Sequence, residues 1–344
     1  MRILQVNSAT NLGGGETHVL ELVEALRSRG HDVIVAGRPD GAVHPQIQFS
    51  FRSSADLITA IRLNRYLKHN PFDIVHAHVA RDYTVVAAAA LGLPVKVVFT
   101  RHLLYPVRGN PLYRRVDGWM APTSQMLARL APLRPKRTAQ IPNWVDLSKF
   151  QYSPHDMHQP VNIGLLGQIS PHKGHEDALE ALRQLGAGYR LIIAGRGEES
   201  YVARLKEQSR SLPVEFSGFA EFREFFQTVD VLLVPSWEEP FGIVLLEAMA
   251  SGIPVISTSA GGPLDIIRPG VDGILVPPRS PQALAAAVRS LSEPQLRAGI
   301  IAHARERVEA NYDIQKVVPR IESFYLEVLS GTPVIPPFQM TNEK

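Results

Sequence analysis

Two carboxylates in the final third of the chain have the spacing and surroundings of a ligand site. Glu239 follows an apolar run at 231–234, and Glu247 stands eight positions later within the apolar stretch 241–250. A helix that is apolar on all sides is a buried helix, in which an unpaired carboxylate costs several kcal/mol. Hydroxyl groups of a ligand could supply the missing hydrogen bonds. Pairing of Glu247 with a core arginine, or capping of a neighbouring strand, is the alternative.

The backbone beside these carboxylates favours an anion. Pro240, Phe241 and Gly242 open the expected helix, so its unpaired N–H groups and the positive end of its dipole face the preceding strand. Lys173 lies at a similar point in the segment 167–175, between another strand and helix, where its ammonium group could reach anionic oxygen. A surface lysine is the alternative. The segment lacks the spacing of a Walker loop.

Three consecutive glycines mark a second loop near the N-terminus. Gly13, Gly14 and Gly15 lie between the first expected strand and the first expected helix, where a bare backbone lets a ligand approach closely. His18 occupies the position of the third glycine in a dinucleotide fingerprint, which excludes that motif. We expect a phosphate or acceptor loop here, with a plain tight turn as the alternative.

Histidines at the ends of strands are the remaining polar candidates. His102 follows the apolar strand 95–100, so its side chain could enter a ligand cleft. His76 and His78 share one face of strand 73–78, but two ligands without an evident third do not favour a metal site. The sequence contains no Asp-x-Asp motif that would hold magnesium or manganese. The chemistry is therefore expected to need no metal and no cofactor.

Composition limits the class of protein. The chain has 344 residues, of which 45% are hydrophobic and 20% charged, and it has no cysteine. These values indicate a globular protein of two domains without disulfides or thiolate chemistry. No apolar run approaches the roughly 20 residues that span a membrane, and the first residues have a strand pattern instead of that of a signal peptide. A cytoplasmic location is expected.

Positive charge is concentrated in the first half of the chain. Residues 1–150 contain 19 Lys and Arg against 10 Asp and Glu, whereas the remainder contains 17 against 23. Much of the excess lies in 96–137, where cations are interspersed with Leu103, Tyr105 and Trp119. The segment 101–137 could contact an acidic acceptor or an anionic membrane, as a peripheral protein on the inner face. A solvated basic face is the alternative, and no nucleic-acid-binding motif accompanies the charge.

Strands and helices are expected to alternate along the whole chain. Apolar strand patterns occur at 2–7, 31–37, 73–78 and 95–100, and again at 161–166, 190–194, 214–217, 231–234, 254–258 and 273–276. Helical spacing between them favours parallel sheets covered on both faces. We predict two doubly wound, Rossmann-like α/β domains, 1–150 and 160–311, with 151–160 as the linker. A helix at 312–330 could pack back on the first domain, before a weakly ordered tail at 331–344.

These motifs resemble those of the family-four retaining glycosyltransferases, which move a sugar from an activated nucleotide. The pair Glu239 and Glu247, with Pro-Phe-Gly between them, is the most specific part of the resemblance. The other matching segments are 13–16, 72–78, 98–102, 141–146, 167–174, 192–197 and 236–277. The resemblance implies the GT-B fold, with two domains facing across a cleft. It also implies metal-independent transfer to a cell-envelope glycan or lipid-linked acceptor, and leaves UDP, GDP or ADP open as the donor nucleotide.

Carried over residue by residue, the resemblance implies a role for each candidate. Glu247 would bind the ribose hydroxyls of the donor, Glu239 the transferred sugar, and Lys173 the diphosphate. His102 would stand near the sugar and help the transition-state charge to form. Glu238 is a competing carboxylate, but the Pro-Phe-Gly register selects Glu239. The wider set of implied contacts comprises Gln168, Phe241, Gly242, Ile243 and Val244 for the donor, and Gly13, Gly14 and Gly15 for phosphate or acceptor.

Two positions depart from the family pattern, because Gln168 stands where arginine is usual and Trp144 where glycine is usual. Without the arginine, Lys173 and the helix N-terminus must neutralise more of the leaving diphosphate. A dissociative front-face reaction is expected, with a covalent carboxylate intermediate as the alternative. Two other functions stay open: a nucleotide-sugar epimerase or hydrolase on the same fold, or a catalytically silent sugar-nucleotide-binding protein.

Overall fold

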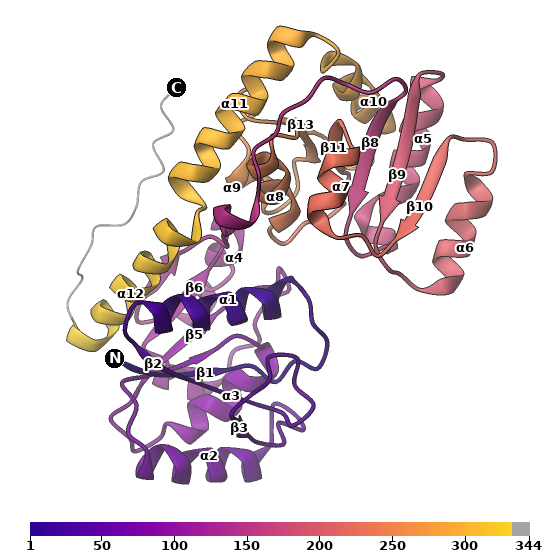
Figure 1. The fold of residues 1–344 in the computed structure, drawn as a ribbon. Coiled ribbons are helices and arrows are strands. Elements are labelled where there is room, and N and C mark those ends of the chain that lie inside the picture. Colours follow the sequence, from indigo (N-terminus) through magenta and orange to yellow (C-terminus); the bar gives the residue numbers. More distant parts are fainter. Residues whose placement is uncertain (332–344) are drawn as a thin grey trace. The chain divides into compact units, whose positions relative to one another are not determined.

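The chain divides into two compact units in a computed structural model that describes residues 1–331. Unit 1 comprises Met1–Asn143 and the chain from Gln315, and unit 2 comprises Trp144–Ile314. Apart from Gly331, the predicted tail lies outside the described residues. Figure 1 shows each unit as a sheet with helices packed beside it.

The Pro-rich segment 151–160 is not the linker, because the division falls between Asn143 and Trp144. The segment packs on unit 2 instead. The Asp230 carboxylate accepts hydrogen bonds from the main-chain N–H groups of His158 (3.0 Å) and Asn162 (2.6 Å). The segment 151–160 has no regular secondary structure, so its sequence resembles that of a linker. The hydrogen bonds that fix it to unit 2 are made to Asp230, which is far away along the chain and gives no local signal.

Unit 1 is built on a seven-stranded parallel sheet in the order β3-β2-β1-β4-β5-β6-β7. Its strands are β1 (Arg2–Val6), β2 (Asp32–Gly37), β3 (Ile47–Gln48), β4 (Ile74–Ala77), β5 (Lys96–Thr100), β6 (Gly118–Ala121) and β7 (Thr138–Gln140). The sequence pattern predicts β1, β2, β4 and β5 but not the other three. These have only two, four and three residues, too few to show an alternation of apolar and polar positions.

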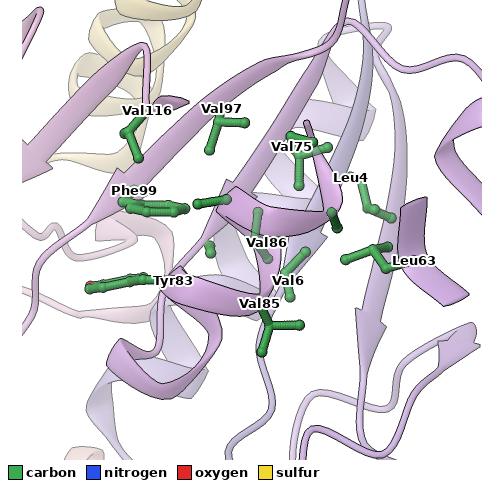
Figure 2. Close-up of a cluster of buried hydrophobic side chains, with 14 of the residues drawn as sticks. Leu4, Val6, Leu63, Val75, Tyr83, Val85, Val86, Val97, Phe99 and Val116 are labelled. Atoms are coloured by element: carbon green, nitrogen blue, oxygen red, sulfur yellow. The ribbon is translucent and has the colours of Figure 1, made fainter. Parts of the chain in front are cut away.

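Helices of unit 1 cover an apolar core. They are α1 (Gly14–Ser28), α2 (Leu57–His69), α3 (Ala80–Ala89), α4 (Ser124–Ala128) and α12 (Ile314–Ser330), with short 3₁₀ turns η1 (Pro111–Arg115) and η2 (Ala131–Leu133). Figure 2 shows part of this core, a cluster that contains Leu4 and Val6 from β1 and Val85 and Val86 from α3. Alternate residues of β1 thus point to the face of the sheet that α3 covers.

The C-terminal helix α12 completes unit 1. Its side chains Phe324, Tyr325 and Val328 are buried. A Cβ atom at Gly118 in β6 would lie 2.7 Å from the Phe324 ring and 2.9 Å from Val328, so the absence of a side chain there lets the helix approach the sheet. The helix also brings a buried phenol, Tyr325, into the unit that contains the N-terminus.

Unit 2 has a six-stranded parallel sheet in the order β10-β9-β8-β11-β12-β13. Its strands are β8 (Val161–Leu166), β9 (Tyr189–Ala194), β10 (Val214–Gly218), β11 (Val231–Val234), β12 (Val255–Thr258) and β13 (Ile274–Val276). Its helices are α5 (His175–Leu185), α6 (Glu199–Gln208), α7 (Phe222–Thr228), α8 (Ile243–Ser251), α9 (Pro263–Ile266), α10 (Pro281–Ser290) and α11 (Pro294–Asn311), with 3₁₀ turns η3 (Leu147–Lys149) and η4 (Pro171–Lys173).

Two apolar clusters cover the two faces of this second sheet. Along β11, Leu232 and Val234 join one cluster, whereas Val231 and Leu233 join the other. A strand that is buried on both faces reads as a continuous apolar run, which is why β11 is predicted with its correct bounds. The loop that follows β11 therefore starts from a strand that is packed on both faces. In residues 1–331, no helix combines the length and apolar character needed to cross a bilayer.

Candidate active site

Two neighbouring strands of unit 2, β8 and β11, end in loops that are bound to each other. The main-chain N–H of Trp237, in the loop after β11, donates to the carbonyl of His172 in the loop after β8 (2.8 Å). The Trp237 indole N–H donates to Asp177 in the first turn of α5 (2.6 Å). Gly174 has φ of 72°, and a Cβ atom there would lie 2.0 Å from the carbonyl oxygen of Pro235. The loops therefore form one closely packed unit.

Lys173 and Glu239 form an ion pair where these loops meet. The Lys173 ammonium lies 2.7 Å from Glu239 Oε2, and the Ser236 hydroxyl donates to the same oxygen (2.9 Å). Glu239 exposes 7% of its side chain and Lys173 exposes 26%, whereas Glu238 is exposed. The other oxygen, Oε1, makes no hydrogen bond with the residues that the structure describes. The pair thus leaves one carboxylate oxygen and two ammonium protons for a ligand.

Helix α8 carries Glu247 on a partly open stripe. Its N-cap is Gly242, with φ of 96°, so the helix begins at Ile243. The residues Leu245, Leu246, Ala248, Met249 and Ala250 are buried, but Ile243, Val244 and Glu247 are half-buried. These three positions lie on one side of a helix. The expectation of a helix buried on every side is therefore wrong along this stripe, where Glu247 is not enclosed by apolar side chains.

The two departures from the family pattern lie in different surroundings. Gln168 is exposed, just after β8, where Gly167 lies so close to Gly195 that a Cβ atom on Gly195 would be 1.7 Å from the Gly167 carbonyl oxygen. Trp144 is buried, with 2% of its surface exposed, at the start of unit 2. The indole of Trp144 is therefore part of the interior, while the Gln168 side chain faces solvent.

The three glycines of unit 1 begin helix α1. Apolar residues at helical spacing predict a helix at 16–29. The observed helix starts two residues earlier, with Gly13 as its N-cap and Gly14 and Gly15 in its first turn. Glu16 Oε2 accepts a hydrogen bond from the main-chain N–H of Gly13 (3.2 Å), so the Glu16 side chain binds one N–H group at the start of the helix. A Cβ atom at Gly15 would meet nothing within 4 Å. The segment is thus an open helix N-terminus, and its use by phosphate or acceptor stays a prediction.

His102 belongs to a cluster of four histidines in unit 1. His76 lies on β4, His78 follows that strand directly, His18 lies on α1, and His102 follows β5. The rings of His76 and His78 lie 4.0 Å apart, and those of His18 and His102 lie 5.5 Å apart. Burial and, to a smaller extent, the nearby Arg101 charge lower the pKa of His102 to about 4. The pKa values of the other three are also lowered, mainly by burial. All four rings are therefore neutral near pH 7.

Two side chains that hold this cluster, Gln5 and Tyr325, are not among the predicted site residues. Gln5 Oε1 lies 2.7 Å from His78 Nε2, and Gln5 Nε2 lies 3.2 Å from the hydroxyl of Tyr325. A buried Gln in the apolar strand 2–7 and two His in strand 73–78 were the available signal, because buried polar groups require partners. The Tyr325 partner lies 320 residues from Gln5, too far along the chain for any pattern to reveal.

Several cations of the basic stretch stabilise the fold. Arg101 is buried and donates to the carbonyl of Tyr105. Arg115 donates to the carbonyls of Ala90 and Leu93 and to Asp117, which Lys136 also contacts at 3.1 Å. Trp119 is 1% exposed, so its expected place on a surface is wrong; it stacks edge-on with Phe99 in the core. The exposed members of the stretch include Leu103, Tyr105, Arg108, Arg114 and Arg134.

One cluster of possible metal ligands occurs among residues 1–331, formed by His155, His158 and Asp230. It lies before β11, at the opposite end of that strand from Glu239. Asp230 already accepts from the His158 ring (2.7 Å) as well as from two main-chain N–H groups. Its hydrogen bonds therefore account for the buried carboxylate as an anchor of the segment 151–160.

The candidate residues thus form two groups, one in each unit. Lys173, Glu239 and the stripe of α8 lie at the carboxyl ends of the unit 2 strands, where parallel α/β sheets bind ligands. His102 lies at the carboxyl end of β5 in unit 1. The group in unit 2 is charged and the group in unit 1 is a neutral imidazole, and both follow buried strands.

Comparisons with known proteins identify the family of the chain. Residues 12–149 match the family described as Glycosyltransferase Family 4, and residues 154–307 match Glycosyl transferases group 1. A phosphatidyl-myo-inositol mannosyltransferase of Mycolicibacterium smegmatis is 30% identical, over 93% of this chain and 91% of its own. A GDP-mannose-dependent alpha-mannosyltransferase of the same organism is 29% identical, over 85% and 88%. A glycogen synthase of Mycobacterium tuberculosis is 27% identical, over 96% of each chain.

Solved structures show the same fold. HepE of Anabaena, in complex with UDP and glucose, superposes with a TM-score of 0.81 at 23% identity, over 96% of this chain and 100% of that chain. A glycosyltransferase from Rickettsia africae has a TM-score of 0.85 at 21% identity, over 96% and 99%. The predicted GT-B fold is confirmed, as is the predicted enzyme class. The chain is a glycosyltransferase and belongs to family four.

Proposed function

We propose that this glycosyltransferase moves a sugar from a nucleotide-sugar donor to a cell-envelope glycan or lipid-linked acceptor, with retention of configuration and without a metal. The observation that carries the donor half of the proposal is the site on unit 2. A carboxylate with one unbonded oxygen, an ammonium group and a half-open carboxylate on α8 follow two adjacent parallel strands. Sugar hydroxyls and a diphosphate are the ligands that match this set.

Each group has a separate role in the proposed donor complex. Glu247, with Ile243 and Val244 beside it, accepts hydrogen bonds from the ribose hydroxyls while the base and ribose lie along the stripe. Glu239 Oε1 accepts from hydroxyls of the transferred sugar. Lys173 and the main-chain N–H groups at the start of α8 face the diphosphate, whose negative charge grows as the glycosidic bond breaks. Preorganised donors at those oxygens lower the barrier.

His102 supplies the contribution of unit 1. A neutral imidazole beside the reacting sugar adds no positive charge to an oxocarbenium-like centre, which a cation would repel. The leaving phosphate takes the proton of the acceptor hydroxyl on the same face, so that no dedicated base is required. The low pKa of His102 supports this assignment, because the ring stays uncharged near pH 7.

A panel of nucleotide sugars tests the donor proposal. The panel contains GDP-mannose and UDP-glucose, each with EDTA present. We expect nucleotide release that depends on an added glycan or lipid-linked acceptor, and an α-linked product from an α-linked donor. Conversion of the donor without acceptor would show an epimerase or hydrolase instead. Binding without turnover against any acceptor would show a silent sugar-nucleotide-binding protein.

The acceptor side is proposed to include an anionic membrane surface. Leu103 and Tyr105 expose 48% and 70% of their surfaces, and Arg108 and Arg114 are exposed close to them in sequence. Apolar side chains beside cations suit the boundary of an anionic bilayer. The similar phosphatidyl-myo-inositol mannosyltransferase is named for a lipid acceptor, which supports the same class of acceptor here.

Vesicle sedimentation tests this surface. Vesicles containing phosphatidylglycerol should bind the wild-type protein at low salt and release it at high salt. The triple variant Arg108→Ala, Arg114→Ala and Arg134→Ala should lose most of this binding while it stays folded, because these side chains are exposed. Full binding by the triple variant, or binding that salt does not weaken, would reject the membrane surface.

A further inference from the structure

An unbroken series of hydrogen bonds crosses the interior of unit 1 and ends at His102. Its five bonds join side chains from β1, β4, β5, α12 and the loops after β4 and β5. The series runs from Thr100 Oγ1 to His76 Nε2 (2.7 Å), from His76 Nδ1 to the Tyr325 hydroxyl (2.7 Å), from that hydroxyl to Gln5 Nε2 (3.2 Å), from Gln5 Oε1 to His78 Nε2 (2.7 Å), and from His78 Nδ1 to His102 Nε2 (3.4 Å).

The amide of Gln5 fixes the direction of the bonds on the His102 side. An amide oxygen only accepts, so His78 Nε2 must carry the proton that it donates to Gln5. Burial lowers the pKa of His78 well below its usual value, and the ring is therefore neutral. A neutral imidazole has one donor and one acceptor, so His78 Nδ1 accepts. His102 Nε2 must then carry its proton, which leaves His102 Nδ1 as an acceptor.

The same amide fixes the bonds on the other side. Gln5 Nε2 only donates, so the Tyr325 oxygen accepts and its hydroxyl proton goes to His76 Nδ1. Burial raises the pKa of Tyr325, so the hydroxyl keeps its proton. His76 is also neutral and donates from Nε2 to the hydroxyl oxygen of Thr100. Every bond in the series thus points in a direction set by one amide.

Only two arrangements of protons satisfy all five bonds. Rotating the Gln5 amide by half a turn would exchange its donor and acceptor, and each of the other donors would have to reverse. In that second arrangement His102 would carry its proton on Nδ1 and present a donor instead of an acceptor. A mixture within the series would leave two donors or two acceptors facing each other in the interior, which costs of the order of 1–3 kcal/mol.

We infer that Gln5, His78 and Tyr325 are positioning residues that hold His102 as the neutral tautomer protonated on Nε2, with Nδ1 presented as a hydrogen-bond acceptor. The inference deepens the proposed function, on which it rests for its catalytic meaning: an acceptor at Nδ1 can bind a hydroxyl of the transferred sugar. The state of the ring is nevertheless a property of the protein without substrate. Tyr325 makes helix α12 part of the machinery that sets it.

Nitrogen-15 NMR of the ligand-free, full-length protein tests the inference. Histidine is labelled with nitrogen-15, and the His102 signals are identified by their loss in His102→Gln. The two ring nitrogens are distinguished by their couplings to the ring carbon-bound protons. We expect a protonated Nε2 and an unprotonated Nδ1 at pH 7. A protonated Nδ1, or averaging between the two tautomers in the wild-type protein, would overturn the inference.

Two variants and a control separate positioning from mere structural support. Tyr325→Phe removes one oxygen, and Gln5→Leu removes the directing amide. Both should convert the single His102 tautomer into a mixture. Tyr312→Phe is the control, because Tyr312 is also buried and donates to the carbonyl of Asp265 (3.0 Å), but lies in unit 2. It should leave the His102 signals unchanged.

The outcomes remain distinct from those of the donor experiments. Retention of the wild-type tautomer in Tyr325→Phe and Gln5→Leu would show that the series does not position His102, whatever the activity. A protein with the expected tautomer that transfers no sugar would contradict the proposed function alone. The wild-type spectrum decides the direction of the series even if a variant fails to fold.

Discussion

Breaking the ion pair between Lys173 and Glu239 from its two ends should have unequal effects on stability. Three variants test this: Lys173→Met, Glu239→Gln and the double variant. Lys173→Met leaves a carboxylate that is 7% exposed with only the Ser236 hydroxyl as its partner. Glu239→Gln leaves an ammonium group that is 26% exposed and can turn to water, while the amide oxygen keeps both hydrogen bonds.

The burial of each partner sets the magnitudes. Removing one partner of a fully buried pair costs about 3–5 kcal/mol, and the partial exposure of Lys173 reduces this to about 2–3 kcal/mol for Lys173→Met. Glu239→Gln should cost about 1 kcal/mol, because a neutral hydrogen bond replaces a charged one. The double variant removes the isolated charge as well, so it should cost less than the sum and give a coupling of about 1–2 kcal/mol.

Urea unfolding at pH 7 measures these differences. Hydrogen exchange of peptides from 231–250 assigns the loss to unit 2, since two units need not unfold together. The control pair is Arg183 and Glu180, whose ion pair of 2.9 Å is 41% and 46% exposed and should show a coupling of at most about 0.5 kcal/mol. If the stability loss of the double variant equals the sum of the two single losses to within about 0.5 kcal/mol, Lys173 and Glu239 are not coupled and the reasoning is refuted.

Three further predictions concern ligand binding, backbone packing and pH. Glu247→Ala should weaken nucleotide-sugar binding in calorimetry by about 1–3 kcal/mol while Glu238→Ala does not, and equal affinities would remove the ribose role. Gly262→Ala would place Cβ 2.2 Å from a backbone oxygen and should lower the melting temperature. Gly299→Ala, on α11 with nothing within 4 Å, should instead stabilise by about 0.5–1 kcal/mol. Burial lowers the pKa of His175 to about 4, so the unfolded chain binds the proton first and stability falls by about 3 kcal/mol from pH 6.5 to 4. His175→Gln should reduce the pH dependence of unfolding by this amount, while the buried histidines of unit 1, whose pKa values are also lowered, keep their own contribution.

Sequence patterns predict the parts of this fold that depend on local periodicity. Strands β8 and β11 have the predicted bounds, because continuous apolar runs between polar loops are distinctive. Strand β6 is not predicted, although all of its residues are buried. It has only four residues, begins with Gly118 and is followed by Pro122, so its sequence resembles a loop. The edge strands β3 and β7 are also not predicted, because two and three residues are too few to show a strand pattern.

The candidate site shows the same division between local and distant information. The Pro-Phe-Gly register leads to Glu239, the more buried of two adjacent carboxylates. The pairing of Glu239 with Lys173 is not predictable, because 66 residues separate them and only the adjacency of β8 and β11 joins their loops. The partners of His102 are hidden in a similar way, since strand order and helix α12 determine them.

The close contact between Gly174 and Pro235 has a consequence for the kinetics of ligand association. The loops after β8 and β11 cannot separate without breaking backbone packing, so the groups at their tips keep one geometry in the absence of a ligand. At the proposed donor site, a nucleotide would therefore meet a surface that needs no loop ordering, and the entropy lost on binding would be mainly its own. Association with unit 2 should then be limited by collision and orientation, so differences in affinity among nucleotides would arise from their dissociation rates.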